Sequence, residues 1–314
     1  MKNTRFNLNQ TEVYLRDKFV PFEDANLSIA SAPVLYGLSV YTVFSATWND
    51  KRQKLYIFRL RDHYNRLVDS AKIMDFGGFV QNWSYQKFES TMLELIKRNA
   101  VKQDVSVRAT VFIDELAPGT KMRGLTNSFS AYIYPMGSLH GKDAIDVCVS
   151  SWTRTPDNAI PPRAKVNGNY ANAGLMKNEA LLNGYDEAIA MDEHGHVAEG
   201  TVANLFIVRD GKLITPDGST DILEGITRNS VLAIADSLKL AHEQRSVDRS
   251  ELYLADEVFM CGSSAKITPV LSVDKRLIGD GYIGPITAKL MKYYAAVLRG
   301  DKKQFAHWLT PYQY

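Results

Sequence analysis

Several features that mark secreted, membrane-spanning or metal-binding proteins are missing from this sequence. It has only two cysteines, Cys148 and Cys261, which lie far apart and cannot by themselves make a disulfide framework or a zinc site. The longest apolar stretches, such as residues 32–36 and 40–46, are too short and too interrupted to cross a bilayer. No apolar core of a signal peptide follows the polar residues at the start. We therefore expect a soluble protein of the cytoplasm that does not bind a membrane.

An excess of charge of either sign is also absent. Lysine and arginine number 37 and aspartate and glutamate 35, so the formal net charge is +2. No block of like charges is long enough to be a nucleic-acid-binding arm, and we expect no nucleic-acid partner. Hydrophobic residues make up 45% of the chain and charged residues 23%, close to the averages for folded proteins, which excludes a disordered chain. The 314 residues suit two domains of ordinary size or one large one.

The motifs of several common enzyme classes are missing as well. There is no Gly-x-Ser-x-Gly nucleophile elbow and no Walker loop, so hydrolase and P-loop functions lack their usual anchors. The six histidines form no metal-ligand pattern, and we expect no metal site. Residues 279–284 match GxGxxG and open a helix, but only about thirty residues follow, too few for the βαβ unit that a dinucleotide needs. This segment is therefore predicted to be a glycine-rich turn.

The hydrophobic pattern predicts an α+β fold. Apolar residues at helical spacing predict helices over residues 61–76, 85–99, 227–240 and 285–298. Two strand-like runs, residues 204–208 and 212–215, flank Asp210-Gly211, a dipeptide typical of tight hairpins. The strands come in runs with helices added, without strict βαβ alternation, which favours α+β over a doubly wound sheet.

The turn-rich residues 135–142 are the best candidate for a domain boundary, because they separate strand-like runs over 128–134 and 144–151. We expect a small N-terminal α/β domain over residues 1–135, an interdomain loop over 136–143, and a larger β-rich domain with helices over 144–314.

The most informative segment is residues 162–170, Pro-Arg-Ala-Lys-Val-Asn-Gly-Asn-Tyr. Its lysine, Lys165, lies between a proline-led extended stretch and a turn of small residues. Because a desolvated amine loses its proton more readily, this lysine could act as a Schiff-base nucleophile. Further along, Glu199 enters a strand, where a carboxylate could pair with a ring nitrogen and keep it protonated, as an electron-sink cofactor requires.

Three other segments could hold a phosphate group. Residues 223–228 open the predicted 227–240 helix, whose N–H groups and dipole suit an anion. Ser263 and Ser264 follow a strand and offer hydroxyls and turn amides. Arg66 lies three residues after His63 on one helix and could supply a bidentate guanidinium. Each segment has an ordinary explanation alone, but their order along the chain points to a cofactor enzyme.

This order of segments resembles the class IV (fold type IV) pyridoxal 5′-phosphate (PLP) aminotransferases, most closely the branched-chain amino acid aminotransferases. The resemblance runs from Tyr36-Gly37 to the last helix and is most specific at residues 162–170, 181–206, 225–228 and 252–260. It implies a fold type IV enzyme in which Lys165 is the catalytic lysine that carries PLP and acts as general acid and base. Glu199 is implied to pair with the pyridine nitrogen, and Tyr170 to lie near the ring oxygen. The implied phosphate-binding residues are Arg66, Ile226, Thr227 and Ser263.

The resemblance is mixed around the substrate. The branched-chain motif after the Tyr-Gly pair has Phe-Glu-Gly and then an arginine, but here Thr42, Val43 and Ser45 replace the acid, the glycine and the arginine. These replacements are expected to remove charge from one wall of the substrate pocket. Residues 41–44, Tyr-Thr-Val-Phe, instead resemble the (R)-selective amine transaminases, as does the arginine-bearing loop over 118–123. The implied substrate-binding residues are Tyr36, Tyr41, Val43, Arg108, Arg123, Ser264 and Ala265.

The resemblance implies a transaminase that moves the amino group of branched-chain L-amino acids to 2-oxoglutarate, as a homodimer or larger homo-oligomer. An (R)-selective amine or D-amino acid transaminase of the same fold is the main alternative, because of residues 41–44. An aminodeoxychorismate-lyase-like enzyme is a further alternative. A non-catalytic binding protein is the last, and the presence of both Lys165 and Glu199 argues against it.

Overall fold

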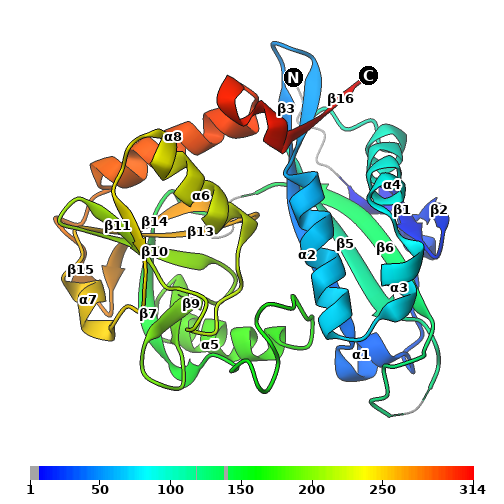
Figure 1. Ribbon diagram of the computed structural model, residues 1–314, viewed down its shortest axis with the longest axis horizontal. Helices are drawn as coiled ribbons and strands as arrows, with labels where there is room; N and C mark the ends of the chain where they lie inside the picture. Colours follow the sequence, from blue (N-terminus) through cyan, green and yellow to red (C-terminus); the bar gives the residue numbers. More distant parts are fainter. Residues whose placement is uncertain (1–6, 118, 138–140) are drawn as a thin grey trace. The chain divides into compact units, whose positions relative to one another are not determined.

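The computed structural model describes residues 7–117, 119–137 and 141–314, which fold into two compact units (Figure 1). The first unit comprises Met1–Met136, Ala164–Gly168 and Val297–Tyr314, and the second Gly137–Arg163 and Asn169–Ala296. The segment that carries Lys165, expected in the C-terminal domain, is thus grouped with the first unit. The interdomain loop over 136–143 includes residues outside the described ranges, and the domain limits stay a prediction.

The first unit is built on an antiparallel sheet of seven strands. These are β1 (Glu12–Leu15), β2 (Lys18–Pro21), β3 (Ser39–Asn49), β4 (Lys54–Phe58), β5 (Val105–Ile113), β6 (Asn127–Pro135) and β16 (Leu309–Gln313). Their order across the sheet is β16-β4-β3-β5-β6-β1-β2. The C-terminal strand β16 pairs with β4, opposite the edge formed by the N-terminal hairpin. This pairing joins the two ends of the chain to one sheet.

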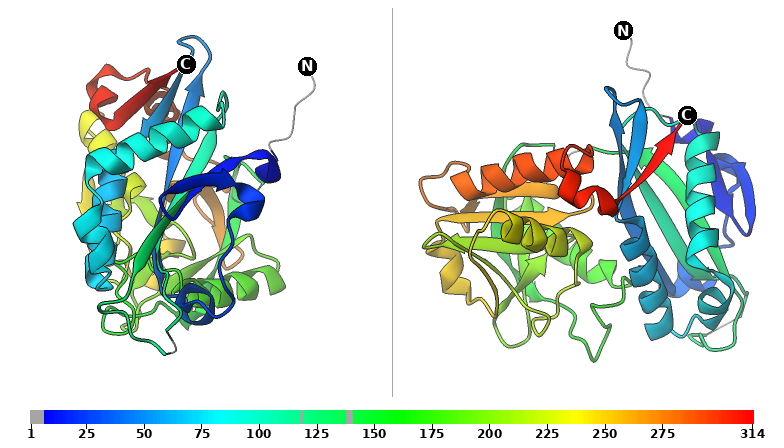
Figure 2. Two further views of the ribbon diagram at one scale, coloured as in Figure 1. Left: turned by 90° about the vertical axis from the view of Figure 1, so that its right-hand side faces the viewer. Right: turned by 45° about the horizontal axis from the view of Figure 1, so that its top comes forward.

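Helices cover one face of this sheet. They are α2 (Leu60–Ile73), α3 (Gly77–Asn82) and α4 (Tyr85–Arg98), and α2 contacts β3 while α3 and α4 contact β6 (Figure 2). The side chains of Phe44, Phe88 and Phe129 meet between the sheet and these helices. The unit also contains the short helices α1 (Ala32–Tyr36), η1 (Leu8–Gln10), η2 (Phe22–Asp24) and η3 (Lys303–Trp308).

The two helices predicted in this half of the chain are confirmed. The helix expected over 61–76 is α2, which ends earlier because Asp75 takes a left-handed backbone angle, φ 56°. The helix expected over 85–99 is α4, where the Ser84 side chain accepts a hydrogen bond from the Lys87 N–H at its start. Lys97 and Arg98 in its last turn complement the helix dipole.

The second unit is built on a mixed sheet of nine strands. These are β7 (Ile145–Thr153), β8 (Glu187–Met191), β9 (Val197–Gly200), β10 (Asn204–Arg209), β11 (Lys212–Thr215), β12 (His242–Gln244), β13 (Glu257–Gly262), β14 (Lys266–Val273) and β15 (Arg276–Leu277). The order is β12-β11-β10-β13-β14-β7-β8-β9, with β15 beside β14. The helices are α5 (Tyr170–Leu182), α6 (Ile226–Ser237), α7 (Arg249–Tyr253) and α8 (Pro285–Leu298). Sheets with added helices in both units confirm the α+β prediction.

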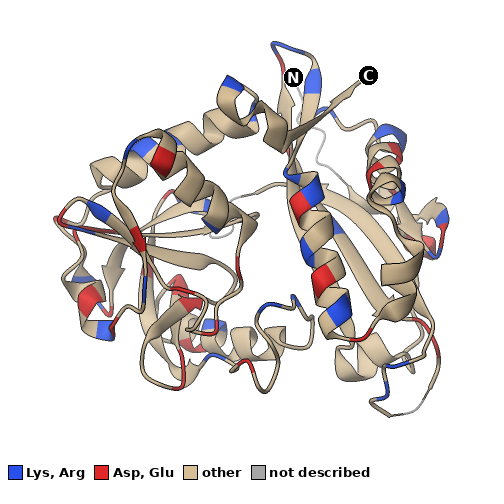
Figure 3. Cartoon of the chain, viewed as in Figure 1, with Lys and Arg blue, Asp and Glu red and all other residues tan. Residues whose placement is uncertain are grey.

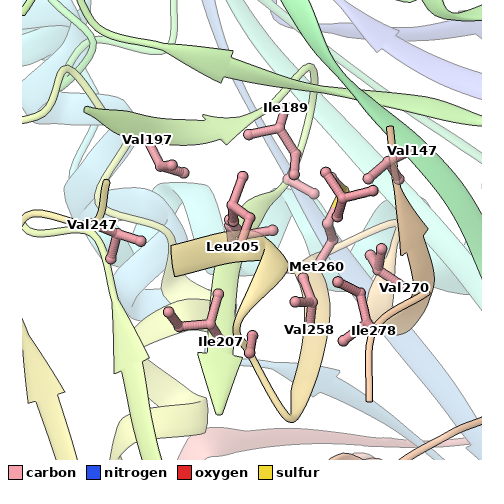
Figure 4. Close-up of a cluster of buried hydrophobic side chains, with 14 of the residues drawn as sticks. Val147, Ile189, Val197, Leu205, Ile207, Val247, Val258, Met260, Val270 and Ile278 are labelled. Atoms are coloured by element: carbon pink, nitrogen blue, oxygen red, sulfur yellow. The ribbon is translucent and has the colours of Figure 1, made fainter. Parts of the chain in front are cut away.

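A core of buried aliphatic side chains holds the second sheet together (Figure 4). Val147, Ile189, Leu205, Val258 and Val270 come from five different strands, and each is at most 3% exposed. The predicted hairpin is also confirmed, because Asp210 and Gly211 both have positive φ in the turn that joins β10 to β11.

The GxGxxG segment is a turn that leads into α8, as predicted. The Glu257 carboxylate accepts hydrogen bonds from the N–H groups of Ile286 (2.9 Å) and Thr287 (2.6 Å) in the first turn of this helix. A side chain at Gly284 would overlap Glu257. A carboxylate of the chain itself therefore occupies the place that a nucleotide phosphate takes in a dinucleotide fold.

Acidic and basic residues are interspersed along the chain of both units (Figure 3). Within the described residues, none of the helices has the length and apolar character needed to cross a membrane.

Candidate active site

Lys165 is held beside β3 by its main chain. Its carbonyl accepts a hydrogen bond from the Tyr41 N–H (3.0 Å), and its own N–H donates to the Ser70 hydroxyl of α2 (3.1 Å). The next residues continue this contact, since the Asn167 N–H donates to the Ser39 carbonyl (2.9 Å). The backbone of this lysine is therefore anchored by a strand and a helix, and neither hydrogen bond uses its side-chain amine.

Glycine is required where the chain before β3 meets this segment. Gly37 has φ 67°, and a Cβ atom there would lie 2.6 Å from the Cα of Gly168. No other residue fits so close an approach at that backbone angle. The Tyr36-Gly37 pair therefore allows the lysine segment to lie against β3.

Two cationic side chains lie near the ring of Tyr41. The Lys165 amine is 5.0 Å from the centroid of the tyrosine ring, and the Arg108 guanidinium carbon is 3.6 Å from it. Arg108 also donates to the Asn167 side-chain oxygen (2.5 Å). The structure thus brings together three residues of the sequence prediction, Lys165, Tyr41 and Arg108. An arginine that contacts the same ring as the lysine is able to bind the carboxylate of a substrate.

Two residues that depart from the branched-chain motif, Thr42 and Val43, lie on opposite faces of β3. Val43 pairs with Arg108 across β3 and β5 and shares the face of Tyr41. Thr42 points the other way, toward α2, where it contacts His63 and Arg66. Thr42 therefore does not share one wall with Val43, as the sequence had led us to expect, because a period of two places neighbouring side chains on opposite faces.

A buried polar cluster joins Thr42 to α2. The Thr42 hydroxyl lies 2.7 Å from His63 Nδ1 and accepts a hydrogen bond from Arg66 Nη2 (3.2 Å). Burial lowers the pKa of His63 well below its ordinary value, and the nearby cations Arg66, Arg59 and Lys165 lower it further. His63 is therefore neutral at physiological pH.

Glu199 is a buried carboxylate in the second unit, at the end of β9, and is 4% exposed. One oxygen accepts from Arg154 (2.7 Å) and from the Leu223 N–H (3.3 Å), and the other accepts from the Asn204 side-chain amide (2.8 Å). These donors stabilise a negative charge that would otherwise be costly in a buried place.

Asn204 connects Glu199 to the start of α6. Its amide donates both to Glu199 and to the Leu223 carbonyl (2.8 Å), and a side chain at Gly225 would overlap its oxygen. Within the described residues no side chain caps α6, and its first turn holds no acidic residue. Ile226 and Thr227 form this first turn, and both are buried. The start of α6 is therefore suited to an anion from outside the chain.

The turn that joins β13 to β14 carries Ser263, Ser264 and Ala265. It lies close to the group around Asn204, because Asn204 pairs with Cys261 across β10 and β13. The second unit thus brings together Glu199, the start of α6 and the serine turn.

Three further predicted residues lie at the end of α1, at the start of α5 and on the surface. Tyr170 opens α5, and Tyr36 ends α1 with 42% of its surface exposed. Arg123 forms a surface ion pair with Asp75 (3.1 Å), and its side chain is 88% exposed. Pro118, in the same predicted loop, lies outside the described residues. The assigned roles of Tyr36, Tyr170 and Arg123 stay predictions.

Sequence reasoning missed Arg154 and Asn204. Their positions in the sequence could have indicated them. Arg154 comes directly after the strand β7, and Asn204 lies five residues after Glu199 in the segment that resembles the family. Their importance depends on the buried carboxylate that they share, which only the folded chain shows. Among residues 7–117, 119–137 and 141–314, no three His, Cys, Asp or Glu side chains gather closely enough to hold a metal ion.

A family model described as amino-transferase class IV matches residues 39–273, which is most of the chain. The chain belongs to the class IV aminotransferases. A probable branched-chain-amino-acid aminotransferase of Aquifex aeolicus is 40% identical over 95% of this chain and 96% of its own length. The branched-chain-amino-acid aminotransferase of Escherichia coli K12 is 34% identical over 95% and 96%.

Solved structures of this aminotransferase family have the same fold. The branched-chain aminotransferase of Thermoproteus uzoniensis, solved with norvaline, superposes with a TM-score of 0.90 at 35% identity, covering 96% of this chain and 99% of that one. The Thermobaculum terrenum enzyme in its PLP form has the same TM-score and identity, covering 97% and 99%. The fold type IV prediction is confirmed, and so is the prediction of a PLP-dependent aminotransferase.

The residues present suit PLP. Its aldehyde needs a lysine amine, its pyridine nitrogen needs a carboxylate, and its phosphate needs an anion site. Lys165 supplies an amine on an anchored backbone, and Glu199 a buried carboxylate held by three donors. The start of α6 has no side-chain cap among the described residues and no acidic residue in its first turn.

Proposed function

We propose that this class IV aminotransferase moves the amino group of branched-chain L-amino acids to 2-oxoglutarate. The observation that carries the proposal is Arg108, a half-buried cation packed on Tyr41 within reach of the same ring as the Lys165 amine. A cation in this place suits a substrate that carries a carboxylate beside its amine. The names of the relatives from A. aeolicus and E. coli support the same substrate class.

PLP, when bound, supplies an electron sink for the negative charge that develops on the donor's α-carbon. Lys165 would hold the cofactor through Nζ, and the same amine would act as the general base and acid for the donor's α-proton. Glu199 would hold a proton on the pyridine nitrogen. Arg154 and Asn204 act through Glu199, because they stabilise its negative charge.

The other residues proposed to bind PLP would orient it and take no part in the chemical steps. Arg66, Ile226, Thr227 and Ser263 would hold the phosphate, and Tyr170 would contact the ring oxygen. These contacts would hold the cofactor in a fixed orientation toward the substrate amine and the Lys165 amine, which lowers the entropic cost of the reaction. Tyr36, Tyr41, Val43, Ser264 and Ala265 line the substrate side, with Arg123 as a further candidate for carboxylate binding.

Removing the Arg66 guanidinium should weaken cofactor retention more than it slows chemistry on the cofactor that remains. For Arg66→Ala, the loss of a charge-assisted contact is expected to cost about 1.5–3 kcal/mol of PLP binding. Equilibrium dialysis of the holoenzyme measures this cost. If the variant keeps PLP as tightly as the parent, Arg66 does not belong to the phosphate site.

An (R)-selective amine transaminase is the alternative that a specific observation favours, because Val43 presents an apolar side chain beside Tyr41. We expect L-leucine to be the better donor by about 10-fold or more over (R)-1-phenylethylamine, since an amine without a carboxylate leaves Arg108 unpaired. Steady-state rates with both donors and with a D-amino acid, each with 2-oxoglutarate, test this. If the amine is the faster donor, the alternative replaces the branched-chain proposal.

Arg108→Met is the matched variant for this comparison. It removes the charge, keeps an apolar stem of similar length, and should lower the rate with L-leucine while sparing the amine. Equal losses of rate with both donors would show that Arg108 does not recognise the carboxylate.

We also propose that the enzyme works in the cytoplasm as a homodimer or larger homo-oligomer. The family resemblance and the scarcity of cysteine support this.

A further inference from the structure

Thr42 lies where β3 meets α2, and its side chain is fully buried. Its hydroxyl is 2.7 Å from His63 Nδ1 and 3.2 Å from Arg66 Nη2. His63 and Arg66 are three residues apart in one helix, so both project from the same side of α2. One hydroxyl therefore contacts the side chains of two successive positions on this helix face.

Arg66 fixes the role of the Thr42 hydroxyl. A guanidinium can only donate, which makes Thr42 Oγ1 its acceptor. The His63 ring is 1% exposed, and burial lowers its pKa, so it is neutral. A threonine oxygen can accept a second hydrogen bond or donate its proton, so the contact with His63 Nδ1 runs in the direction that the ring tautomer sets. In both cases the contact with His63 holds the Thr42 hydroxyl where Arg66 donates to it.

The ring of His63 is itself fixed by packing. It lies against Phe44 of β3, with ring centroids 5.5 Å apart, and Phe44 is fully buried. Further along the same helix, the Ser70 hydroxyl donates to the Arg66 carbonyl (2.8 Å) and accepts from the Lys165 N–H. The His63 ring and the backbone at Arg66 are therefore both held in place around Thr42.

The chemistry at position 42 distinguishes this chain from the branched-chain motif, which has an acid there. A carboxylate would form an ion pair with the guanidinium and take up part of its positive charge. A hydroxyl accepts one hydrogen bond from the guanidinium and carries no charge that would neutralise it.

We propose that Thr42, held against His63, is a positioning residue that orients the Arg66 guanidinium for the cofactor phosphate. This inference rests on the phosphate-binding role of Arg66 proposed above. Thr42 does not contact the reacting atoms. It acts on how firmly the phosphate is held.

The test is the rate at which the holoenzyme loses PLP on dilution into a reagent that traps the free aldehyde. Thr42→Val keeps the shape of the side chain without the hydroxyl and should lose PLP about 3–10-fold faster. Thr42→Ser keeps the hydroxyl and should match the parent. Thr42→Ala removes the same hydroxyl with less crowding, and is measured in parallel in case the valine variant does not fold. PLP loss from Thr42→Val or Thr42→Ala at the parental rate would overturn the inference.

Two comparisons distinguish positioning of Arg66 from a general structural effect. The double variant of Thr42→Val with Arg66→Ala should lose PLP no faster than Arg66→Ala alone, because the hydroxyl then has no guanidinium to orient. Binding of pyridoxal, which has no phosphate, to the apoenzyme should be the same in the parent and in Thr42→Val. Weaker pyridoxal binding in Thr42→Val, or additive losses in the double variant, would overturn the inference.

The same set of variants separates this inference from the role proposed for Arg66. If Arg66→Ala retains PLP as the parent does, the assigned role of Arg66 fails, and the positioning role fails with it. If Arg66→Ala loses PLP quickly while Thr42→Val does not, only the positioning role fails.

Discussion

Replacing Lys165 with alanine should abolish turnover and remove the visible absorbance band of lysine-bound PLP. In the proposed mechanism this amine both carries the cofactor and moves the proton, and loss of a general acid–base group alone costs about 10²–10⁴-fold in rate. The fold should survive, because the hydrogen bonds at this position use the main chain and not the side chain. An absorbance spectrum and single-turnover rates with L-leucine measure both effects.

Lys72→Ala is the matched control, since Lys72 is an exposed lysine on α2 whose amine is 3.5 Å from the Asp69 carboxylate. It should keep the band and the rate. A Lys165→Ala variant that kept the visible band and near-parental rates would assign the catalytic amine to another lysine.

Glu199→Gln should have the second largest effect, a loss of about 10²-fold or more in the rate of the amino-donor half-reaction. An amide has nearly the shape of a carboxylate but cannot hold the pyridine nitrogen protonated, so the developing negative charge loses its sink. The variant should still bind PLP, because the proposed phosphate contacts and Lys165 are untouched. Stopped-flow absorbance with L-leucine follows this half-reaction directly.

The Glu199 variant also leaves Arg154 without its carboxylate partner. Arg154 is 9% exposed, and breaking a buried ion pair by removing one partner costs about 3–5 kcal/mol of stability. Thermal unfolding of the apoenzyme therefore has to be measured beside the kinetics.

Glu187→Gln separates the kinetic effect from the loss of stability. Glu187 is another buried carboxylate of the second unit, 1% exposed, and it is paired with Lys177 (3.2 Å) and Thr201 (2.7 Å). It should lose stability without slowing the half-reaction. Equal half-reaction rates in Glu199→Gln and the parent would show that another group acts on the pyridine nitrogen.

The sequence by itself determined the features that depend on neighbours along the chain. Helical spacing of apolar residues located α2, α4, α6 and α8, and Asp210-Gly211 located the hairpin of β10 and β11. The ends of helices were less well predicted, because a left-handed residue such as Asp75 or Lys239 follows the last helical turn without a glycine to announce it. The order of the cofactor segments also indicated the enzyme class, since a motif is a local pattern.

Only the tertiary structure decided which residues act together. Lys165 is grouped with β3 and α2, which lie about a hundred residues earlier in the chain, because its backbone completes hydrogen bonds with Tyr41 and Ser70. The face on which Thr42 lies depends on strand register and on the helix that covers the sheet. The pairing of Glu199 with Arg154 likewise follows from burial, since a charge removed from water requires a partner, and folding alone determines which distant residue is near enough to provide it.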